Sequence, residues 1–256
     1  MKAIELNGKP VGNGRFPLVC APLVGRDRDT LLAEAAAVAA KGPDLLEWRV
    51  DFFEAIGRTG EVVDLAGRLK EVAGGLPLLF TRRSAREGGE AIALSEAQVV
   101  DLYRAVCRAG AVDLVDFEIG NDPAHVRTVR ELSRGSGIGM IMSFHDFQGT
   151  PPLELLHQRF LAAEQLGADV AKVAVMPRSM QDVLTLLTAT WRASEKLSIP
   201  VVSMAMGAEG ALTRLCGWAF GSAMTFGVGQ GSSAPGQLPI EELQAGLALL
   251  RKAAGK

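Results

Sequence analysis

The sequence is poor in several residue types that mark particular classes of protein. Its 256 residues contain three cysteines, three histidines and one tyrosine. The cysteines (Cys20, Cys107 and Cys216) are odd in number and widely spaced, which argues against a disulfide framework and against a CxxC zinc site. Lysine plus arginine number 27 and aspartate plus glutamate 29, giving a net charge of −2. Without a basic surplus, we expect no nucleic-acid partner and no acidic membrane surface.

Long hydrophobic runs are also missing. No apolar stretch approaches the roughly 18–20 residues of a membrane span. The first residues reach an acid at Glu5 before any apolar signal core could form. We interpret the three cysteines as buried free thiols. These observations predict a cytoplasmic protein that does not associate with membranes.

Short apolar, β-branched runs are present, and they recur about every 25–35 residues with amphipathic segments between them, which is the pattern of βα units. The predicted strands are Leu18–Leu23, Leu45–Arg49, Leu76–Thr81, Asp113–Glu118, Gly137–His145, Asp169–Val175, Ile199–Met204 and Ala219–Phe226. The predicted helices include Asp29–Ala40, Ser95–Ala109, Leu153–Leu166, Ser179–Leu197 and Pro239 to about Ala253. Because these strands are apolar almost throughout, we expect a parallel sheet that helices cover.

Eight βα repeats in about 250 residues predict a closed (β/α)8 barrel, the TIM barrel. A doubly wound sheet is the alternative, but no GxGxxG follows the first strand to support a dinucleotide site. Turn signals at Asn7-Gly8 and Asn13-Gly14 predict an N-terminal β-hairpin before the barrel. No linker or composition shift interrupts the chain, so we expect residues 1–256 to form a single catalytic domain.

Polar residues interrupt the apolar strands at their C-terminal ends, where the chemistry of such barrels takes place. Lys172 lies inside the sixth strand, and burial disfavours its ammonium and favours a nucleophilic amine that can form a Schiff base. The structural alternative is a lysine paired with a carboxylate such as Glu118. His145 ends the preceding strand, so a lysine and a histidine at one mouth suit imine chemistry with proton transfer. His125 and His157 fall on predicted helices.

A ring of charged residues surrounds this pair in the predicted barrel. Glu47, Arg49, Arg83 and Arg214 follow strand ends. Arginine forks bind carboxylates in a bidentate way, so an anionic small-molecule substrate is the natural interpretation. Loop-holding salt bridges are the alternative for any one of these arginines.

These segments resemble the type I 3-dehydroquinate dehydratases of the shikimate pathway, in order, from about Pro17 to Gln244. The matching motifs are Leu46-Glu47-Trp48-Arg49-Val50-Asp51, Phe80-Thr81-Arg82-Arg83-Ser84 together with Glu87-Gly88-Gly89, Ser143-Phe144-His145-Asp146-Phe147, Lys172-Val173-Ala174-Val175-Met176-Pro177, Met206-Gly207 to Arg214, and Ser233-Ala234-Pro235-Gly236-Gln237. Each motif alone is weak, whereas six segments in the right order, each at a strand end, form a specific pattern.

The resemblance implies a role for each matching residue. Lys172 would form the imine, His145 would be the general acid and base, and Glu87 would position or tune His145. Arg214 would bind the substrate carboxylate. The remaining substrate-binding residues implied by the family are Glu47, Arg49, Arg83, Ser233 and Gln237. The Gly- and Ser-rich segment Gly229–Gly236, here called the closing loop, would exclude water once substrate is bound.

Two positions depart from the family pattern. Arg82 stands where the family usually has an aromatic residue, so Arg82 and Arg83 compete for one role, which we assign to Arg83 because Ser84 follows it. Ala21-Pro22-Leu23 replaces a first-strand serine of some members, so one contact to a substrate hydroxyl is missing or replaced.

The reaction implied by the family is the conversion of 3-dehydroquinate to 3-dehydroshikimate, without a metal or an organic cofactor. The family also implies a homodimer, although no apolar stripe in the sequence identifies the interface. Two other classes share some of these features: a lysine-dependent aldolase, and a non-catalytic barrel that binds an anionic metabolite. The last βα loops lack an obvious Gly-rich phosphate cradle, which argues against an aldolase acting on phosphorylated sugars.

Overall fold

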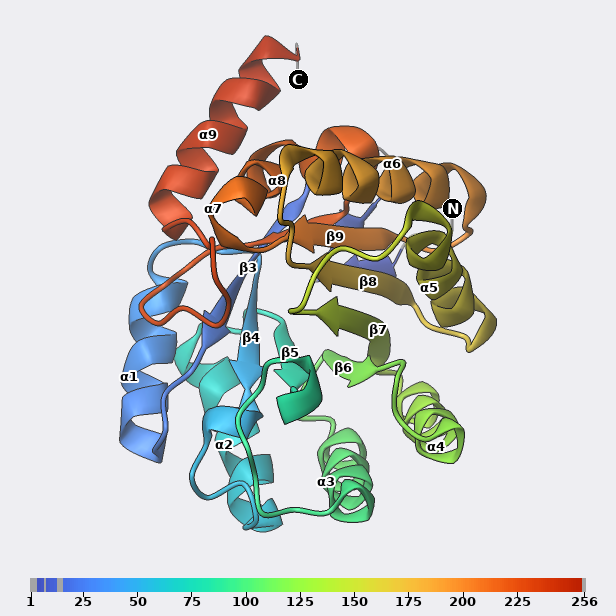
Figure 1. The fold of residues 1–256 in the computed structure, drawn as a ribbon. Helices are drawn as coiled ribbons and strands as arrows, with labels where there is room; N and C mark the ends of the chain where they lie inside the picture. Colours follow the sequence, from blue (N-terminus) through green and yellow to red (C-terminus); the bar gives the residue numbers. More distant parts are fainter. Residues whose placement is uncertain (1–3, 7, 13–15, 255–256) are drawn as a thin grey trace.

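The computed structural model describes residues 4–6, 8–12 and 16–254, in which strands and helices alternate along the chain (Figure 1). The barrel strands are β3 (Leu18–Leu23), β4 (Leu45–Arg49), β5 (Leu78–Thr81), β6 (Leu114–Glu118), β7 (Gly139–Asp146), β8 (Val170–Val175), β9 (Val201–Ala205) and β10 (Met224–Phe226). The helices are α1 (Arg28–Ala39), α2 (Thr59–Val72), α3 (Glu96–Ala109), α4 (Pro123–Gly135), α5 (Leu153–Gln165), α6 (Met180–Lys196), α7 (Gly207–Gly210), α8 (Leu212–Cys216) and α9 (Ile240–Ala253).

The eight strands form one parallel sheet in the order β10-β3-β4-β5-β6-β7-β8-β9. Its two edge strands meet at a single bridge between Val201 and Ser222, where the Ala223 N–H donates to the Val201 carbonyl at 2.8 Å. The sheet is therefore a nearly closed barrel with helices outside it, and the predicted TIM-barrel fold is confirmed.

Local sequence explains most element boundaries. The residues of β3, β4 and β8 are buried throughout, as expected of strands that are covered on both faces. Ser95 and Gln98 form a reciprocal capping box that starts α3. Asp122 caps α4, and Pro123 follows it, where a missing N–H costs nothing.

The last strand is shorter than the predicted Ala219–Phe226. Residues Gly217–Phe220 form a 3₁₀ turn instead, and only Met224–Phe226 pair with β3. Gly221 separates the two with a φ of 97°, a conformation that an L-residue avoids. A Cβ added there would come within 2.3 Å of Ser194. This glycine ends the turn that precedes the strand.

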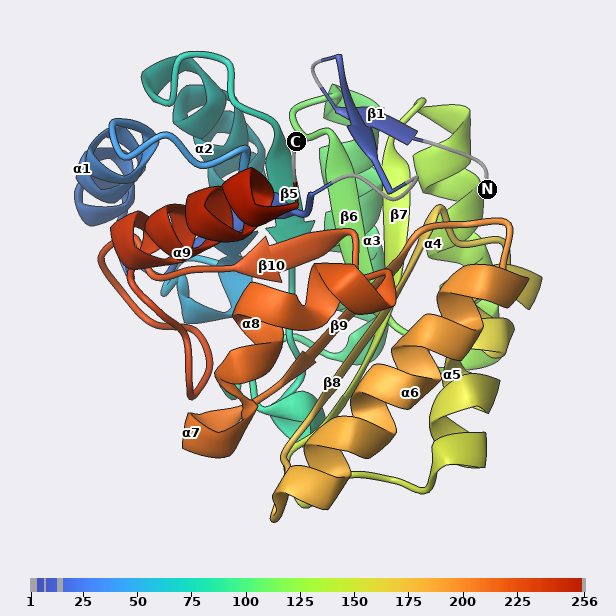
Figure 2. The ribbon, with the colours of Figure 1, turned by 90° about the horizontal axis from the view of Figure 1, so that it is seen from above.

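A two-stranded hairpin, β1 (Ile4–Leu6) and β2 (Lys9–Val11), lies against the end of the barrel at which the strands begin (Figure 2). Leu6 and Val11 are buried with the apolar side chains of the barrel interior. The predicted N-terminal hairpin is confirmed, whereas the Asn13-Gly14 turn lies outside the described residues. Since this end of the interior is filled, the opposite end is the one open to chemistry.

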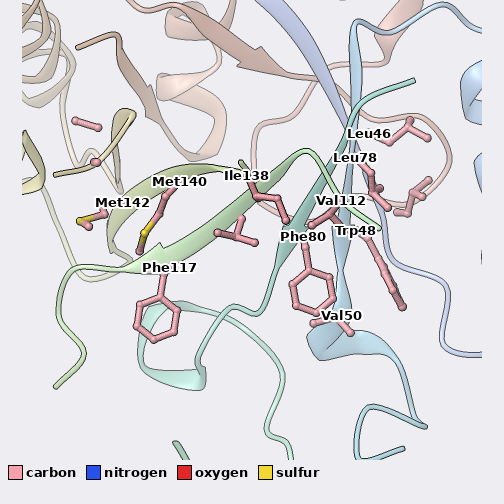
Figure 3. Close-up of a cluster of buried hydrophobic side chains, with 14 of the residues drawn as sticks. Leu46, Trp48, Val50, Leu78, Phe80, Val112, Phe117, Ile138, Met140 and Met142 are labelled. Atoms are coloured by element: carbon pink, nitrogen blue, oxygen red, sulfur yellow. The ribbon is translucent and has the colours of Figure 1, made fainter. Parts of the chain in front are cut away.

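A second apolar layer fills the space between sheet and helices. Figure 3 shows Trp48, Phe80 and Phe117 on this outer side of β4, β5 and β6. Edge-to-face contacts run from Trp48 to Phe80, from Phe80 to Tyr103 and from Tyr103 to Phe117, a geometry that adds stabilisation beyond area burial. This row fixes three strands whose opposite faces carry the polar residues described below. No helix in the described part of the chain is long and apolar enough to cross a membrane.

Candidate active site

Alternate residues of each barrel strand point into the interior, because side chains in a strand alternate between its two faces. On β4 the inward sequence is Leu45, Glu47 and then Arg49, and on β8 it starts with Val170 and Lys172. The first inward layer is thus apolar, and the layers toward the C-terminal ends are polar. The inward side chains of these strands therefore form an apolar layer beneath the cavity and a charged layer around it.

All nine predicted site residues line one cavity at the C-terminal end of the barrel. They are Glu47, Arg49, Arg83, Glu87, His145, Lys172, Arg214, Ser233 and Gln237. Neither His125 on α4 nor His157 on α5 is among the lining residues.

Lys172 is 5 % exposed, and its amine reaches the cavity. Its Nζ lies 3.4 Å from Asp116 Oδ2 and 3.8 Å from Glu47 Oε1. It also lies 4.4 Å from the centre of the Phe226 ring, within cation–π range. The suggested pairing with Glu118 is wrong, because Glu118 accepts hydrogen bonds from Arg83 and from the Ser84 N–H. Lys172 therefore has carboxylate neighbours that balance its charge and also reaches the cavity.

His145 is held by Glu87, which comes from the short η2 turn (Ala85–Glu87) after β5. Glu87 Oε2 accepts the backbone N–H of His145 at 2.9 Å and lies 2.9 Å from its Nδ1. Burial, followed by the charges of Arg83, Lys172 and Arg49, lowers the pKa of His145 well below its ordinary value. Burial and the charge of Glu118 raise the pKa of Glu87 to about 8. When Nδ1 carries the shared proton, Nε2 is free to act as a base.

Arg83 is surrounded by carboxylates. It bonds Asp116 at 2.7 Å and Glu118 at 3.2 Å, and Glu87 lies 3.8 Å away. Although burial acts against the charged form, these carboxylates raise the pKa of Arg83. Arg82 points elsewhere and pairs with Glu96 on α3 at 2.7 Å. Of the two arginines, only Arg83 lines the cavity, as expected.

Arg214 has no carboxylate within salt-bridge distance among the described residues. Its guanidinium donates to the carbonyls of Gly236 at 2.8 Å, Pro235 at 3.2 Å and Phe226 at 3.3 Å. It is 2 % exposed, and burial lowers its pKa to about 10. Arg214 is therefore a buried cation that faces the cavity without a neutralising carboxylate in the described chain.

Ser233 and Ala234 of the closing loop line the cavity, and Arg49 and Arg214 donate hydrogen bonds to carbonyls of this loop. Arg49 pairs in a bidentate way with Asp51 and donates its remaining Nη1 to the Ser233 carbonyl at 3.2 Å. Gln237 accepts the Ser233 N–H at 2.9 Å and donates to its hydroxyl at 3.2 Å. The closing loop and Gln237, the residue that follows it, thus bring a hydroxyl and an amide to the cavity in a defined arrangement.

Several lining residues were not predicted. Phe147, Ala174, Met204, Met206 and Phe226 supply apolar walls. Met204 and Met206 stand two residues apart at the end of β9 and beyond it, a spacing that could have identified them. The lining residues include none from β3, so Ala21-Pro22 brings no hydroxyl to this cavity.

Asp116 was not among the predicted site residues either. It is fully buried beneath the cavity and contacts both Lys172 and Arg83. Burial acts against its charged form, but Arg83 and Lys172 keep its pKa below the ordinary value. Within the described ranges, no group of three or more His, Cys, Asp or Glu residues is arranged to hold a metal ion.

Comparison with known proteins matches residues 19–254 to the family model described as Type I 3-dehydroquinase. The chain belongs to this family. It is 57 % identical over 254 residues to a 3-dehydroquinate dehydratase of Albidiferax ferrireducens, covering 99 % of this chain and 96 % of that protein.

Solved structures of the family agree with this fold. The 3-dehydroquinate dehydratase of Geobacillus kaustophilus is 49 % identical, with a TM-score of 0.95 over 98 % of this chain and 97 % of that one. The type I enzyme of Clostridium difficile, solved with covalently modified comenic acid, is 36 % identical, with a TM-score of 0.94 over 98 % and 99 % of the two chains.

Proposed function

We propose that this protein is a hydro-lyase that converts 3-dehydroquinate to 3-dehydroshikimate in aromatic amino acid biosynthesis. The observation that carries the proposal is the placement of Lys172, His145 and the unneutralised Arg214 in one cavity. Membership of the type I family supports it over the aldolase and the non-catalytic binding protein.

The substrate is a cyclic β-hydroxy ketone with a carboxylate, and its elimination faces two barriers. The C–H beside the ketone is weakly acidic, and hydroxide leaves poorly. Condensation of the ketone with Lys172 releases water and gives a protonated imine, which acidifies the adjacent C–H. No metal or organic cofactor enters this scheme.

His145 completes the elimination. Its neutral imidazole removes the acidified proton and gives an enamine. The enamine then expels the β-hydroxyl, which His145, now protonated, can protonate as it leaves as water. Hydrolysis of the imine releases 3-dehydroshikimate and regenerates the Lys172 amine. The Glu87 contact at 2.9 Å keeps the imidazole oriented through both proton transfers.

Charge complementarity positions the substrate. Arg214 binds its carboxylate, since no protein carboxylate occupies that guanidinium in the described chain. Glu47, Arg49 and Arg83 face the ring and its hydroxyls, and Ser233 and Gln237 contact substrate when the closing loop covers it. In this assignment Lys172 forms the imine, and His145, oriented by Glu87, transfers protons. The other six residues bind the substrate.

The reaction is testable by following the conjugated enone of the product by ultraviolet absorbance. We expect turnover by the wild type and a loss of about 10⁴-fold or more in Lys172→Ala, as for removal of other covalent nucleophiles. Lys70→Ala is the matched control, because Lys70 also pairs with a carboxylate, Asp113, but lies outside the cavity. Full activity in a folded Lys172→Ala variant would overturn the proposal.

The proposal extends to organisation and compartment. We infer one catalytic domain over residues 1–256, which predicts a single cooperative unfolding transition.

We infer a homodimer, supported by Met180, Leu184 and Trp191, which are about half exposed on one face of α6. Sedimentation of wild type and Trp191→Glu would test this, with a monomeric wild type contradicting it. The free thiols of Cys20, Cys107 and Cys216 support the cytoplasm as the compartment.

A further inference from the structure

Asp116 is a buried carboxylate that does not line the cavity but contacts two cations that do. Its Oδ1 accepts hydrogen bonds from Arg83 at 2.7 Å and from the Ser143 hydroxyl at 2.6 Å. Its Oδ2 lies 3.4 Å from Lys172 Nζ. The side chain is 0 % exposed, so its charge is kept out of reach of both substrate and solvent.

The backbone around Asp116 is held as firmly as its side chain. The Tyr103 hydroxyl donates to the Asp116 carbonyl at 2.6 Å and accepts the Arg82 N–H at 3.0 Å. Tyr103 itself belongs to the packed aromatic row outside the barrel. The carboxylate is therefore preorganised: Arg83 and Ser143 fix one oxygen, and the other faces Lys172.

Imine formation preserves the positive charge next to Oδ2. Overall, the Lys172 ammonium and the substrate ketone give a protonated imine and one water. The nitrogen first loses a proton and then forms the C–N bond, and the carbonyl oxygen leaves as water with that proton. The nitrogen carries one positive charge before and after this step. The enamine that follows is neutral at nitrogen, and expulsion of the β-hydroxyl restores the charge. A fixed anion beside the nitrogen thus favours the cationic states without itself moving.

We propose that Asp116 is a positioning residue that aims the Lys172 nitrogen at the substrate carbonyl and stabilises the protonated imine. The inference rests on the proposed function. Glu47 shares the lysine but is 3.8 Å from Nζ and accepts the Thr81 hydroxyl, and it lines the cavity, where substrate competes for it. Asp116 is the contact that substrate cannot displace.

Other titratable groups also bear on this nitrogen, and any pH effect must be separated from theirs. They line the same cavity as Lys172, or in the case of Cys20 lie beside it in the barrel interior, and are Cys20, Glu47, Arg49, Arg83, Glu87, His145 and Arg214. None of these needs to change in the test below, because only residue 116 or its strand neighbour is substituted.

The test measures borohydride-trapped imine by intact mass, in rapid-quench experiments with 3-dehydroquinate from pH 5 to 9. In Asp116→Asn, the pH midpoint for imine formation should move about one unit or more lower, because an opposite charge no longer favours the ammonium. Turnover should fall about 100-fold, because the protonated imine loses its counter-charge. In Asp116→Glu, the pH midpoint for imine formation should return most of the way to the wild-type value.

Glu118→Gln is the matched control. It removes a buried carboxylate from the same strand and from the same arginine, but not from Lys172. A structural role for Asp116 would lower stability and turnover in both variants and leave both midpoints near that of the wild type. An unchanged midpoint in folded Asp116→Asn, or an equal shift in Glu118→Gln, would overturn the inference.

A second measurement covers the case in which Asp116→Asn fails to fold. A crystal structure of the trapped wild-type adduct should place Oδ2 within about 3.5 Å of the Lys172 nitrogen, and a carboxylate turned away would overturn the inference. A wild type that forms no adduct would overturn the proposed function as well. A trapped wild type with an indistinguishable Asp116→Asn would overturn only the role of Asp116.

Discussion

Arg83 and Arg214 are both almost fully buried in the walls of one cavity, at 3 % and 2 % exposure, yet only Arg83 is surrounded by charged groups. Arg83 has Asp116, Glu118 and Glu87 within 3.8 Å. Arg214 contacts carbonyl oxygens and a thioether sulfur. The pKa of Arg83 is raised by its carboxylates, while burial lowers that of Arg214 to about 10.

The charge of Arg83 is balanced by carboxylates of the protein, whereas the charge of Arg214 is not balanced by any carboxylate of the described residues. A buried ion pair that loses one partner leaves an uncompensated charge, so Arg83 should matter for stability. A buried cation without a carboxylate carries a desolvation cost that a substrate carboxylate would offset, so Arg214 should matter for binding.

The largest effect is expected from Arg83→Met, which leaves Asp116, Glu118 and Glu87 without their shared cation. Unfolding free energy from urea titration should fall by about 3–5 kcal/mol. Arg82→Met is the control: its partner Glu96 is 42 % exposed on the side chain, so it should cost about 1 kcal/mol or less. Equal losses in the two variants would remove the distinction between them.

Arg214→Met should reverse this pattern. Its unfolding free energy should stay within about 1 kcal/mol of wild type, because a desolvated charge is removed along with its hydrogen bonds to carbonyls. Its kcat/KM should fall about 100- to 1,000-fold through KM, because the substrate carboxylate loses a bidentate partner. Steady-state kinetics and urea titration of one preparation measure both. A variant as unstable as Arg83→Met would contradict the comparison.

The pH dependence of proton abstraction from the preformed imine, followed by rapid quench, separates the two arginines further, because Arg83 is a cause of the lowered pKa of His145 and Arg214 is not. His145 acts as a base only when neutral, so activity is lost as the pH falls through its lowered pKa. The acidic limb should therefore lie well below pH 6.5 in the wild type and at the same pH in Arg214→Met. A limb at or above pH 6.5 would show that the imidazole is not held in this environment.

The smallest effect is expected from a simple carboxylate anion. If acetate binds Arg214 with a Kd of about 10 mM, then 0.1 M acetate stabilises the fold by about 1.4 kcal/mol, or roughly 3–5 °C in Tm. Thermal unfolding in acetate and in chloride at equal ionic strength measures the difference. Arg214→Met should show no such difference, and a shift retained in that variant would assign the effect to another cation.

Two regularities of the fold explain why residues predicted from strand ends line one cavity. Alternate strand residues share a face, so Glu47 and Arg49 follow the interior Leu45, and Lys172 follows Val170. The ends of parallel strands then gather at one end of a barrel. The same parity separates Arg83 from Arg82, since Arg83 lies four residues beyond the interior Leu79.

Pairing inside the barrel could not be predicted in this way. Glu118 aligns with Ser143, and Ser143 with Lys172, yet Asp116, two residues earlier, contacts the lysine. Barrel strands are tilted and staggered, so residues aligned along the sheet stand at different heights inside it. Which carboxylate reaches Lys172 depends on that tilt, and the tilt cannot be predicted from the local sequence pattern.

The same holds for what Arg214 lacks. The sequence shows many acids near other strand ends, but only the folded chain shows that none reaches this guanidinium in the described residues. Likewise, a run of apolar letters did not reveal that Gly217–Phe220 turns before β10 begins. Both outcomes depend on packing between segments far apart in the chain.

The central claim is that Lys172 forms an imine with 3-dehydroquinate. The most direct measurement is incubation of the protein with this substrate and sodium borohydride, followed by intact mass and peptide mapping. We expect a stable adduct on the peptide that contains Lys172, and no adduct in Lys172→Ala. A folded wild-type protein that forms no adduct, or an adduct mapped to another lysine, would contradict it.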